Sequence, residues 1–273
     1  MSRLNYFQNR PKLTKIDTAS YLRRIHLAPE PPSINFLRKL HRSHLLHIPF
    51  ENLDIHYQKK IILNYEKIYQ KLILEGRGGY CYELNGLFYH LLYHLGFNCH
   101  LISARIRNEK SGEFGKEYEH MAIIVKFGEE SWLADIGYGK YLIYPKKIVL
   151  GEVQMDYTDY WRFTQDADEN FLVQSSEDTS YFKTKYLFST EEKQIIQFME
   201  MNDHQQTSPE SHFTQGRMIT KLTPTGRITL TEKKIKILAL GKTEETELTN
   251  EDEFYSKLEQ HFGITFKQLV RAE

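Results

Sequence analysis

The sequence predicts an α+β fold in which helices come first, strands fill the middle and a mixed region ends the chain. Residues 1–95 carry helical periodicity with N-caps and glycine stops, whereas residues 96–189 are short aromatic and β-branched runs between Gly, Asp and Asn. Residues 190–273 combine helical and strand patterns. We therefore expect a helical bundle, then an antiparallel β-barrel or strongly bent sheet, then an α/β region. No repeat or low-complexity linker separates these regions, so they should pack closely.

Three helices are expected in the first region. The stretch "SINFLRKLHRSHLLH" (Ser33 to His47) spaces its apolar residues near a helical period. The next, "NYEKIYQKLILEG", runs from an Asn64 cap to a Gly76 stop. A third helix follows "EGRGGYC" and ends at Gly96. Between the first two, "IPFENLDIHYQKKIIL" contains Pro49 and mixed polarity, which indicates an ordered connector.

The middle region predicts a series of short strands. Each run is rich in aromatic and β-branched residues, which favour a pleated, half-buried surface. Turn-forming residues separate the runs, as expected for an antiparallel sheet that bends or closes. The predicted strands are "FNCHLISARI", "YEHMAIIVKF", "SWLADIGYG", "YWRFTQ", "NFLVQSS" and "YFKTKYLFS".

The last region predicts a helix, a small sheet and a final helix. Ser189 and Glu192 have the spacing of a capping box, so we expect a helix over "TEEKQIIQFMEMN". Asn250 caps a last helix that stops at Gly263. The turn "TPTG" joins two of the strand candidates. These strands are centred on Met218, Ile228 and Ile237.

Composition excludes several function classes. The chain has 273 residues with 36 Lys or Arg and 36 Asp or Glu, so no net charge favours nucleic acid or an anionic membrane surface. No apolar run reaches the length of a membrane span, and the polar, basic start lacks the apolar core of a signal peptide. The 2 cysteines do not form a disulfide framework. We expect a cytoplasmic protein with a specific small-molecule or protein partner.

Cys81 lies in the stretch "EGRGGYCYELNGLFYHLLYHLG", and two interpretations of it stay open. On a helical wheel it projects into the same arc as the leucines that follow, which is typical of a buried, inert cysteine. It also lies in the first turn, where free N–H groups and the helix dipole stabilise a thiolate. Gly78 and Gly79 remove side chains, so that a substrate could approach the sulfur. Arg77 adds positive charge, unless a carboxylate such as Glu51 consumes it.

A nucleophilic Cys81 needs a base and a group that orients the base, and His120 and Asp135 are the candidates. They lie on strands that would form a hairpin over "KFGEE". A turn at Phe127-Gly128 sets the two residues directly opposite on one face, with Cβ atoms about 5 Å apart. A turn at Gly128-Glu129 makes them diagonal neighbours on that face. A three-residue loop would separate them to opposite faces. The alternative is that both residues merely begin and end strands.

The 12 histidines require a metal site to be considered. His90 and His94 have i,i+4 spacing, but on the wheel they flank the polar side of their helix while Cys81 points elsewhere. Cys99 and His100 are adjacent, so in a strand they face opposite sides. "HRSHLLH" is interpreted as helix surface and core edge. No dinucleotide or phosphate-loop motif occurs. We expect no metal.

Taken together, the motifs resemble those of the arylamine N-acetyltransferases. "HIPFENLDIH", "RGGYCYELNGLF", "EHMAIIV", "WLADIGYG" and "TSPESHF" follow the family's order from about Tyr21 to about Phe213. The resemblance implies that Cys81 accepts an acetyl group, that His120 is the base and that Asp135 orients it. It also implies a helical bundle, a β-barrel and an α/β lid around a Cys-His-Asp core like that of cysteine proteases.

The resemblance further implies acetyl-CoA as cosubstrate and a small aromatic amine or hydrazine as acceptor. Ile106, Tyr138 and Phe213 match positions that line the acceptor pocket in similar proteins. Gly137 and Gly139 could let the CoA chain approach the backbone. We expect no nucleic-acid, membrane or metal partner, and a monomer or weak homo-oligomer.

Other functions remain open at this stage. A cysteine protease or transglutaminase-like enzyme would use the same triad on peptides and ignore acetyl-CoA. A non-catalytic scaffold of the same fold would leave Cys81 with ordinary thiol reactivity. Departures from the family pattern are mild and bear on acceptor preference. They are Tyr82 and Tyr138, where Phe is frequent, and Ile106 and Ile136, where Val is frequent.

Overall fold

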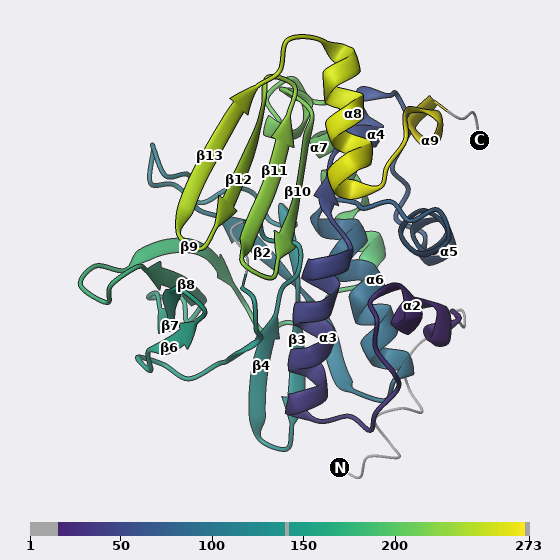
Figure 1. The fold of residues 1–273 in the computed structure, drawn as a ribbon. Helices are drawn as coiled ribbons and strands as arrows, with labels where there is room; N and C mark the ends of the chain where they lie inside the picture. The colour runs from purple at the N-terminus through teal and green to yellow at the C-terminus, as the bar shows by residue number, and fades with distance from the viewer. Residues whose placement is uncertain (1–15, 140–141, 271–273) are drawn as a thin grey trace.

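The computed structural model describes residues 16–139 and 142–270 of the chain. Figure 1 shows a group of helices on one side, a curled sheet beside them, and a second sheet with helix α8 against it. Within the described residues, no helix combines the length and apolar character needed to cross a membrane.

Two helices of the first region begin at side-chain caps, of which the Asn64 cap was predicted and the Ser33 cap was not. The Ser33 side chain accepts the N–H of Phe36 at 3.1 Å, and Asn64 accepts the N–H of Glu66 at 2.9 Å. Gly76, at the expected stop, has the positive φ of +71° that favours glycine. The elements are α2 (Thr18–Arg24), α3 (Ile34–His47), β1 (Phe50–Glu51), α4 (Leu53–His56), α5 (Tyr65–Tyr69), the π-helical continuation η1 (Gln70–Leu74) and α6 (Cys81–His94).

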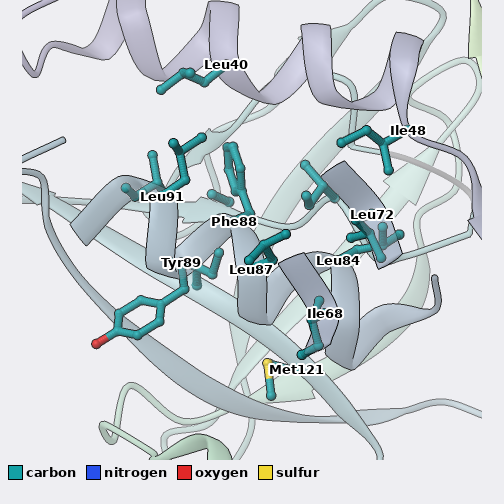
Figure 2. Packing of buried hydrophobic residues seen from close by; sticks show 14 of the residues in the cluster. Leu40, Ile48, Ile68, Leu72, Leu84, Leu87, Phe88, Tyr89, Leu91 and Met121 are labelled. Atoms are coloured by element: carbon teal, nitrogen blue, oxygen red, sulfur yellow. The ribbon is translucent and has the colours of Figure 1, made fainter. Parts of the chain in front are cut away.

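Helix α6 is buried on every side over Cys81–Leu92, which differs from the amphipathic helix expected from its wheel. Figure 2 shows its leucines and Phe88 packed between Leu40 of α3 and Leu72 of η1, with Met121 of β3 on another side. His90 was expected on a polar face but is fully buried, with its ring 4.4 Å from that of Tyr65. The wheel prediction failed because neighbours enclose the whole helix.

Among the described residues, eight strands of the middle region form one antiparallel sheet in the order β5-β4-β3-β2-β9-β8-β7-β6. Its two edges approach each other, because the Gln154 side chain exchanges hydrogen bonds of 3.0 and 2.7 Å with the Lys147 backbone. The prediction of a barrel or strongly bent sheet is therefore confirmed. The strands are β2 (Asn98–Ile106), β3 (His120–Phe127), β4 (Glu130–Ala134), β5 (Lys146–Lys147), β6 (Gln154–Asp156), β7 (Asp159–Gln165), β8 (Phe171–Ser176) and β9 (Lys183–Phe188).

The β3–β4 hairpin adopts the second of the two favourable registers. Phe127 pairs with Glu130 and Ile123 with Ala134, so the turn lies at Gly128-Glu129. Gly128 has a φ of +62°, which a side chain would disfavour. His120 and Asp135 are consequently diagonal neighbours rather than direct partners.

The last region forms a second sheet, of five strands in the described part, in the order β1-β10-β11-β12-β13. The three predicted strands, the turn between Thr223 and Gly226, and the final helix with its Asn250 cap and Gly263 stop are all confirmed. The polar strand β13 was not predicted. These elements are β10 (Met218–Thr223), β11 (Gly226–Thr231), β12 (Lys234–Ala239), β13 (Lys242–Glu247), α8 (Glu251–Phe262) and α9 (Phe266–Val270).

The helix expected to follow a Ser189 cap begins five positions later, at Ile195. The backbone N–H of Lys193 donates to Leu101 O at 2.9 Å, so this segment is extended alongside β2 and cannot coil. The helical part comprises the 3-10 turn η2 (Ile195–Phe198) and α7 (Met199–Thr207), followed by the 3-10 turn η3 (His212–Thr214). Strand β1 joins the sheet of the last region, and the division at residues 95/96 and 189/190 stays a prediction.

Candidate active site

Cys81 is the first residue of α6 and is buried, with 3% of its surface exposed. The Glu83 carboxylate accepts the N–H of Tyr80 at 3.2 Å and so caps this helix start. A Cβ on Gly78 would lie 2.1 Å from Pro49 O, and one on Gly79 would lie 2.7 Å from Glu83 Oε2. The two glycines therefore permit close packing of the chain, and their interpretation as an opening for substrate was wrong.

Arg77 is consumed by structural ion pairs, as the alternative interpretation held. Its Nη2 lies 2.7 Å from Glu51 Oε1 and 2.8 Å from Asp54 Oδ1, and these side chains are almost fully buried. Lys71 adds contacts of 2.7 Å to Asp54 Oδ2 and 2.8 Å to Glu83 Oε1. Burial raises the pKa of Glu83 to about 7, although Lys71 opposes this shift. The five residues form one buried ionic cluster beside the start of α6.

His120 and Asp135 form the predicted pair. The Nε2–H of His120 donates to Asp135 Oδ2 at 2.8 Å, and both side chains are buried. Burial lowers the pKa of His120, but the charge and hydrogen bond of Asp135, together with contacts to Cys81, raise it to about 10. Burial raises the pKa of Asp135, yet His120 and other donors lower it below its usual value. Because Nε2 is bonded to Asp135, the Cys81 contact uses Nδ1.

Further donors hold the Asp135 carboxylate, and they include two side chains that the sequence did not single out. Asn85 Nδ2 of α6 donates to Oδ1 at 2.9 Å, and the Tyr186 hydroxyl of β9 donates to Oδ2 at 3.0 Å. The N–H groups of Gly137 and Tyr138 donate to Oδ1 at 3.1 and 3.0 Å. With its lone pairs engaged in this way, the carboxylate has a fixed orientation. Asn85 lies within the quoted motif "CYELN", which is the one sequence signal that could have indicated it.

His41 also contacts Asp135, through the backbone. Its Nε2 accepts the Asp135 N–H at 3.1 Å, and its Nδ1–H donates to Ile143 O at 3.0 Å. Burial lowers the pKa of His41 to about 4, so the ring is neutral and can accept. His41 and His44 are fully buried, so the interpretation of "HRSHLLH" as surface and core edge was wrong for these two residues.

Cys81 and His120 open onto a cleft of about 420 Å³. The predicted contact residues Ile106, Tyr138 and Phe213 line this cleft. Gly137 and Gly139 line it as well. Side chains from the last region, which include Phe213 and Met218, form part of its wall. The remaining lining residues are Phe50, Asn108, Ser111, Glu113, Phe114, Gly115, Glu119, Gln205 and His212.

Asn52 fastens the last region to the edge of this cleft. Its Nδ2 donates to Phe213 O at 2.8 Å and to Gly216 O at 2.9 Å, while its Oδ1 accepts the Met218 N–H at 2.7 Å. A residue from the first region thus positions two cleft residues far away in sequence. As for metal, in the part of the chain that the structure describes no group of three or more His, Cys, Asp or Glu side chains could hold an ion.

The N-acetyltransferase family model matches residues 33–270. The chain belongs to this family. An arylamine N-acetyltransferase of Escherichia coli is 30% identical over 235 residues, which cover 85% of this chain and 83% of the relative. These comparisons agree with the motifs and with the Cys-His-Asp arrangement found in the fold.

Solved structures of arylamine N-acetyltransferases share the whole architecture. The Mycobacterium smegmatis enzyme superposes with a TM-score of 0.86 at 27% identity, over 95% of this chain and 96% of that chain. The Mycobacterium marinum enzyme in complex with CoA gives a TM-score of 0.85 at 27% identity, over 93% and 95% of the two chains. A Bacillus cereus enzyme is described as having a unique Cys-His-Glu catalytic triad. It superposes with a TM-score of 0.85 at 26% identity, over 92% of this chain and 100% of that chain. Where that triad has Glu, the pair in this acetyltransferase has the shorter Asp135.

Proposed function

We propose that this protein transfers the acetyl group of acetyl-CoA to aromatic amines and hydrazines through an acetyl-Cys81 intermediate. The observation that carries the proposal is that Cys81 and the His120–Asp135 pair meet at one cleft. The names of the relatives and the CoA complex of the Mycobacterium marinum enzyme support the choice of donor and acceptor. In this proposal Cys81 is the nucleophile, His120 the acid and base, and Asp135 the orienting group.

The first step transfers acetyl to sulfur. With its proton on His120, Cys81 is a thiolate that attacks the thioester carbonyl of acetyl-CoA. The carbon–sulfur bond to CoA breaks, and the CoA thiolate takes the proton from the His120 imidazolium. Free CoA leaves, and the products are acetyl-Cys81 and a neutral imidazole.

The second step uses that neutral imidazole as the base. Contacts with Cys81 help to raise the pKa of His120, so acetylation of the sulfur removes that contribution. A lower pKa favours the neutral ring, whose free nitrogen can accept the proton that the amine loses on attack. The amine nitrogen attacks the acetyl carbonyl, its proton passes to His120, and the bond to Cys81 breaks. The N-acetylated product leaves, and Cys81 and His120 again share one proton.

The shape of the cleft supports a flat acceptor. Tyr138 lies edge-on to His120 with ring centroids 5.9 Å apart, and Phe213 lies 6.2 Å from Phe50. We propose that Ile106, Tyr138 and Phe213 contact the aromatic acceptor. Apart from its chain neighbours, no atom of the described residues lies within 4 Å of the position that a Cβ on Gly139 would take. This leaves room for a CoA chain beside its backbone, and we include Gly137 in that contact.

We also propose that residues 190–273 act as a lid over residues 1–95 and 96–189. Phe213 and Met218 of this range lie at the cleft, which supports the assignment. A monomer or weak homo-oligomer in the cytoplasm is the expected state, without nucleic acid. In the described residues, neither Cys81 nor Cys99 forms a disulfide, which suits a compartment that keeps thiols reduced.

Intact-mass measurement after mixing with acetyl-CoA and no amine tests the proposed function. We expect one added acetyl group that maps to Cys81 and disappears when an arylamine is supplied. Cys81→Ser is the control and should gain no acetyl group under the same conditions. Folded wild-type protein that gains none would contradict the proposal. Cleavage or crosslinking of peptides without acetyl-CoA would instead favour a protease or transglutaminase.

A further inference from the structure

One wall of the cleft is an extension of β2 that turns back toward His120. Two backbone bonds of 2.8 Å hold it, from Asn108 N to Glu113 O and from Gly115 N to Ile106 O. Most of its residues line the cleft. The wall is therefore an ordered surface that the acceptor must pass or contact.

Glu119 stands at the base of this wall and lines the same cleft as Cys81. Its Oε2 accepts the backbone N–H of Ile106 at 3.2 Å. The carboxyl group lies against Gly115, where a Cβ would come within 1.7 Å of Oε2. These contacts fix the group in position. Its second oxygen, Oε1, has no hydrogen-bond partner within residues 16–139 and 142–270 and remains able to accept one.

The charge of the described cleft lining is acidic. Glu113 and Glu119 line the cleft, whereas no Lys or Arg of the described residues does, and the His120 imidazolium is paired with Asp135 and Cys81. Burial raises the pKa of Glu119, against the bond from Ile106 and the nearby charges of His120 and Arg105, so its carboxylate has lost part of its water. A partly desolvated carboxylate attracts a cation or an N–H donor, and repels an anion, more strongly than an exposed one.

We propose that Glu119 determines which acceptors the protein uses. It favours aromatic amines and hydrazines that carry a cation or an N–H donor away from the reacting nitrogen, and it disfavours those that carry a carboxylate there. The proposal rests on the acetyl transfer proposed above. Glu119 forms and breaks no covalent bond in this role, and acts through charge and hydrogen bonding alone.

Three para-substituted anilines test the proposal. They are the anion 4-aminobenzoate, its neutral primary amide, and the trimethylammonium-substituted aniline, whose cation offers no second nucleophile. We expect the kcat/KM of the wild-type protein to favour the cation over the anion. Glu119→Gln keeps an oxygen that can accept the Ile106 N–H, and should lower this cation-to-anion ratio about tenfold, equivalent to about 1.4 kcal/mol. The amide should change less than either ion.

Comparison of variant and wild type with the same acceptor cancels the effect of the substituent on amine nucleophilicity. The ratio is also independent of the folded fraction, because both acceptors meet the same enzyme. Glu117→Gln is the matched control, since this exposed residue lies two positions away and outside the cleft lining. The control should leave the ratio unchanged. An unchanged ratio in Glu119→Gln, or an equal fall in both variants, would overturn the proposal.

Failure of acceptor selection is separable from failure of acetyl transfer. If the wild-type protein forms acetyl-Cys81 but Glu119→Gln leaves the cation-to-anion ratio of kcat/KM unchanged, only the role of Glu119 is refuted. If no acetyl-Cys81 forms, the acetyl transfer is refuted, and the acceptor preference with it.

Discussion

His120 and Asp135 are both buried, and they carry opposite charges, positive on His120 and negative on Asp135. The pair is stable because each supplies the counter-charge of the other and because donors surround the carboxylate. Its protonation should therefore be visible in the stability of the whole protein.

We expect this pair to give the folding free energy a specific pH dependence. The pKa of His120 rises from 6.5 to about 10 on folding, so the folded state binds the proton more tightly. The resulting stabilisation is complete below pH 6.5 and is lost as the pH rises through about 10. Asp135 has a lowered pKa and loses its contribution only in acid, outside this window.

Denaturant titrations at several pH values measure this effect. The free energy of unfolding of the wild-type protein should fall more steeply between pH 6.5 and about 10 than that of His120→Gln. The variant retains the other titrating groups, so the difference between the two slopes isolates His120. Equal slopes would show that His120 is not protonated in the folded protein at neutral pH.

The sequence could predict contacts among the active-site residues only where the residues lie close together along the chain. His120 and Asp135 are 15 positions apart in one hairpin, so strand periodicity and a choice of turns were enough to bring them together. His41 is 94 positions from Asp135, and Tyr186 is 51 positions away. Their contacts depend on how helix and sheet pack, which no local pattern encodes. For the same reason, the sequence did not indicate that a neutral His41 accepts the Asp135 N–H.

Among the elements, the loop after β4, which carries the orienting residue Asp135, packs against the start of α6. A Cβ on Gly137 would lie 2.7 Å from Asn85 Nδ2 and 2.8 Å from Cys81 Cα. Backbone of the loop thus lies directly against the first turn of α6. Any side chain at residue 137 must separate the two elements.

Gly137→Ala should therefore destabilise the protein by about 1–3 kcal/mol and slow the alkylation of Cys81 by iodoacetamide, because overpacking moves the loop that carries Asp135. Gly139→Ala is the matched control for stability, since no described residue other than its chain neighbours comes within 4 Å of its Cβ position. Chemical denaturation compares the two variants. Equal stability losses in both would contradict the close contact.

Helices and strands were predicted correctly where residues within the element determine its structure. They were predicted poorly where contacts with distant parts of the chain determine it. The caps at Asn64 and Asn250 were predicted correctly, because a side chain within the same turn makes each bond. The capping box at Ser189 was wrong because Lys193 is drawn into a backbone bond with distant β2. Strand β13 is exposed and polar throughout, so it has no hydrophobic alternation to detect.

At the scale of the whole molecule, the buried ionic cluster joins three helical segments near the start of α6. Arg77 is the cation shared by Glu51 and Asp54, and Glu51 is fully buried. Removal of a partner from a buried pair leaves a charge without compensation, which is far costlier than loss of an exposed pair.

We expect Arg77→Gln to lower the free energy of unfolding by about 3–5 kcal/mol. The control is Arg23→Gln, because Arg23 pairs with Asp17 at 3.8 Å where both side chains are more than half exposed. That change should cost less than about 1 kcal/mol. Urea denaturation of both variants provides the measurement, and a small loss at Arg77 would mean that the cluster is not structurally important.

The bonds made by Asn52 have a consequence for synthesis of the chain. They reach residues up to 166 positions later, and β1 beside it joins its sheet by pairing with β10. The residues of the Cys-His-Asp group therefore emerge from the ribosome well before the wall that encloses them can form. Closing so long a loop is entropically costly and slow, so we infer that nascent chains expose the thiol for a period before the cleft is complete. Access of bulky thiol reagents to Cys81 should be greatest then, and should fall when β10 docks on β1.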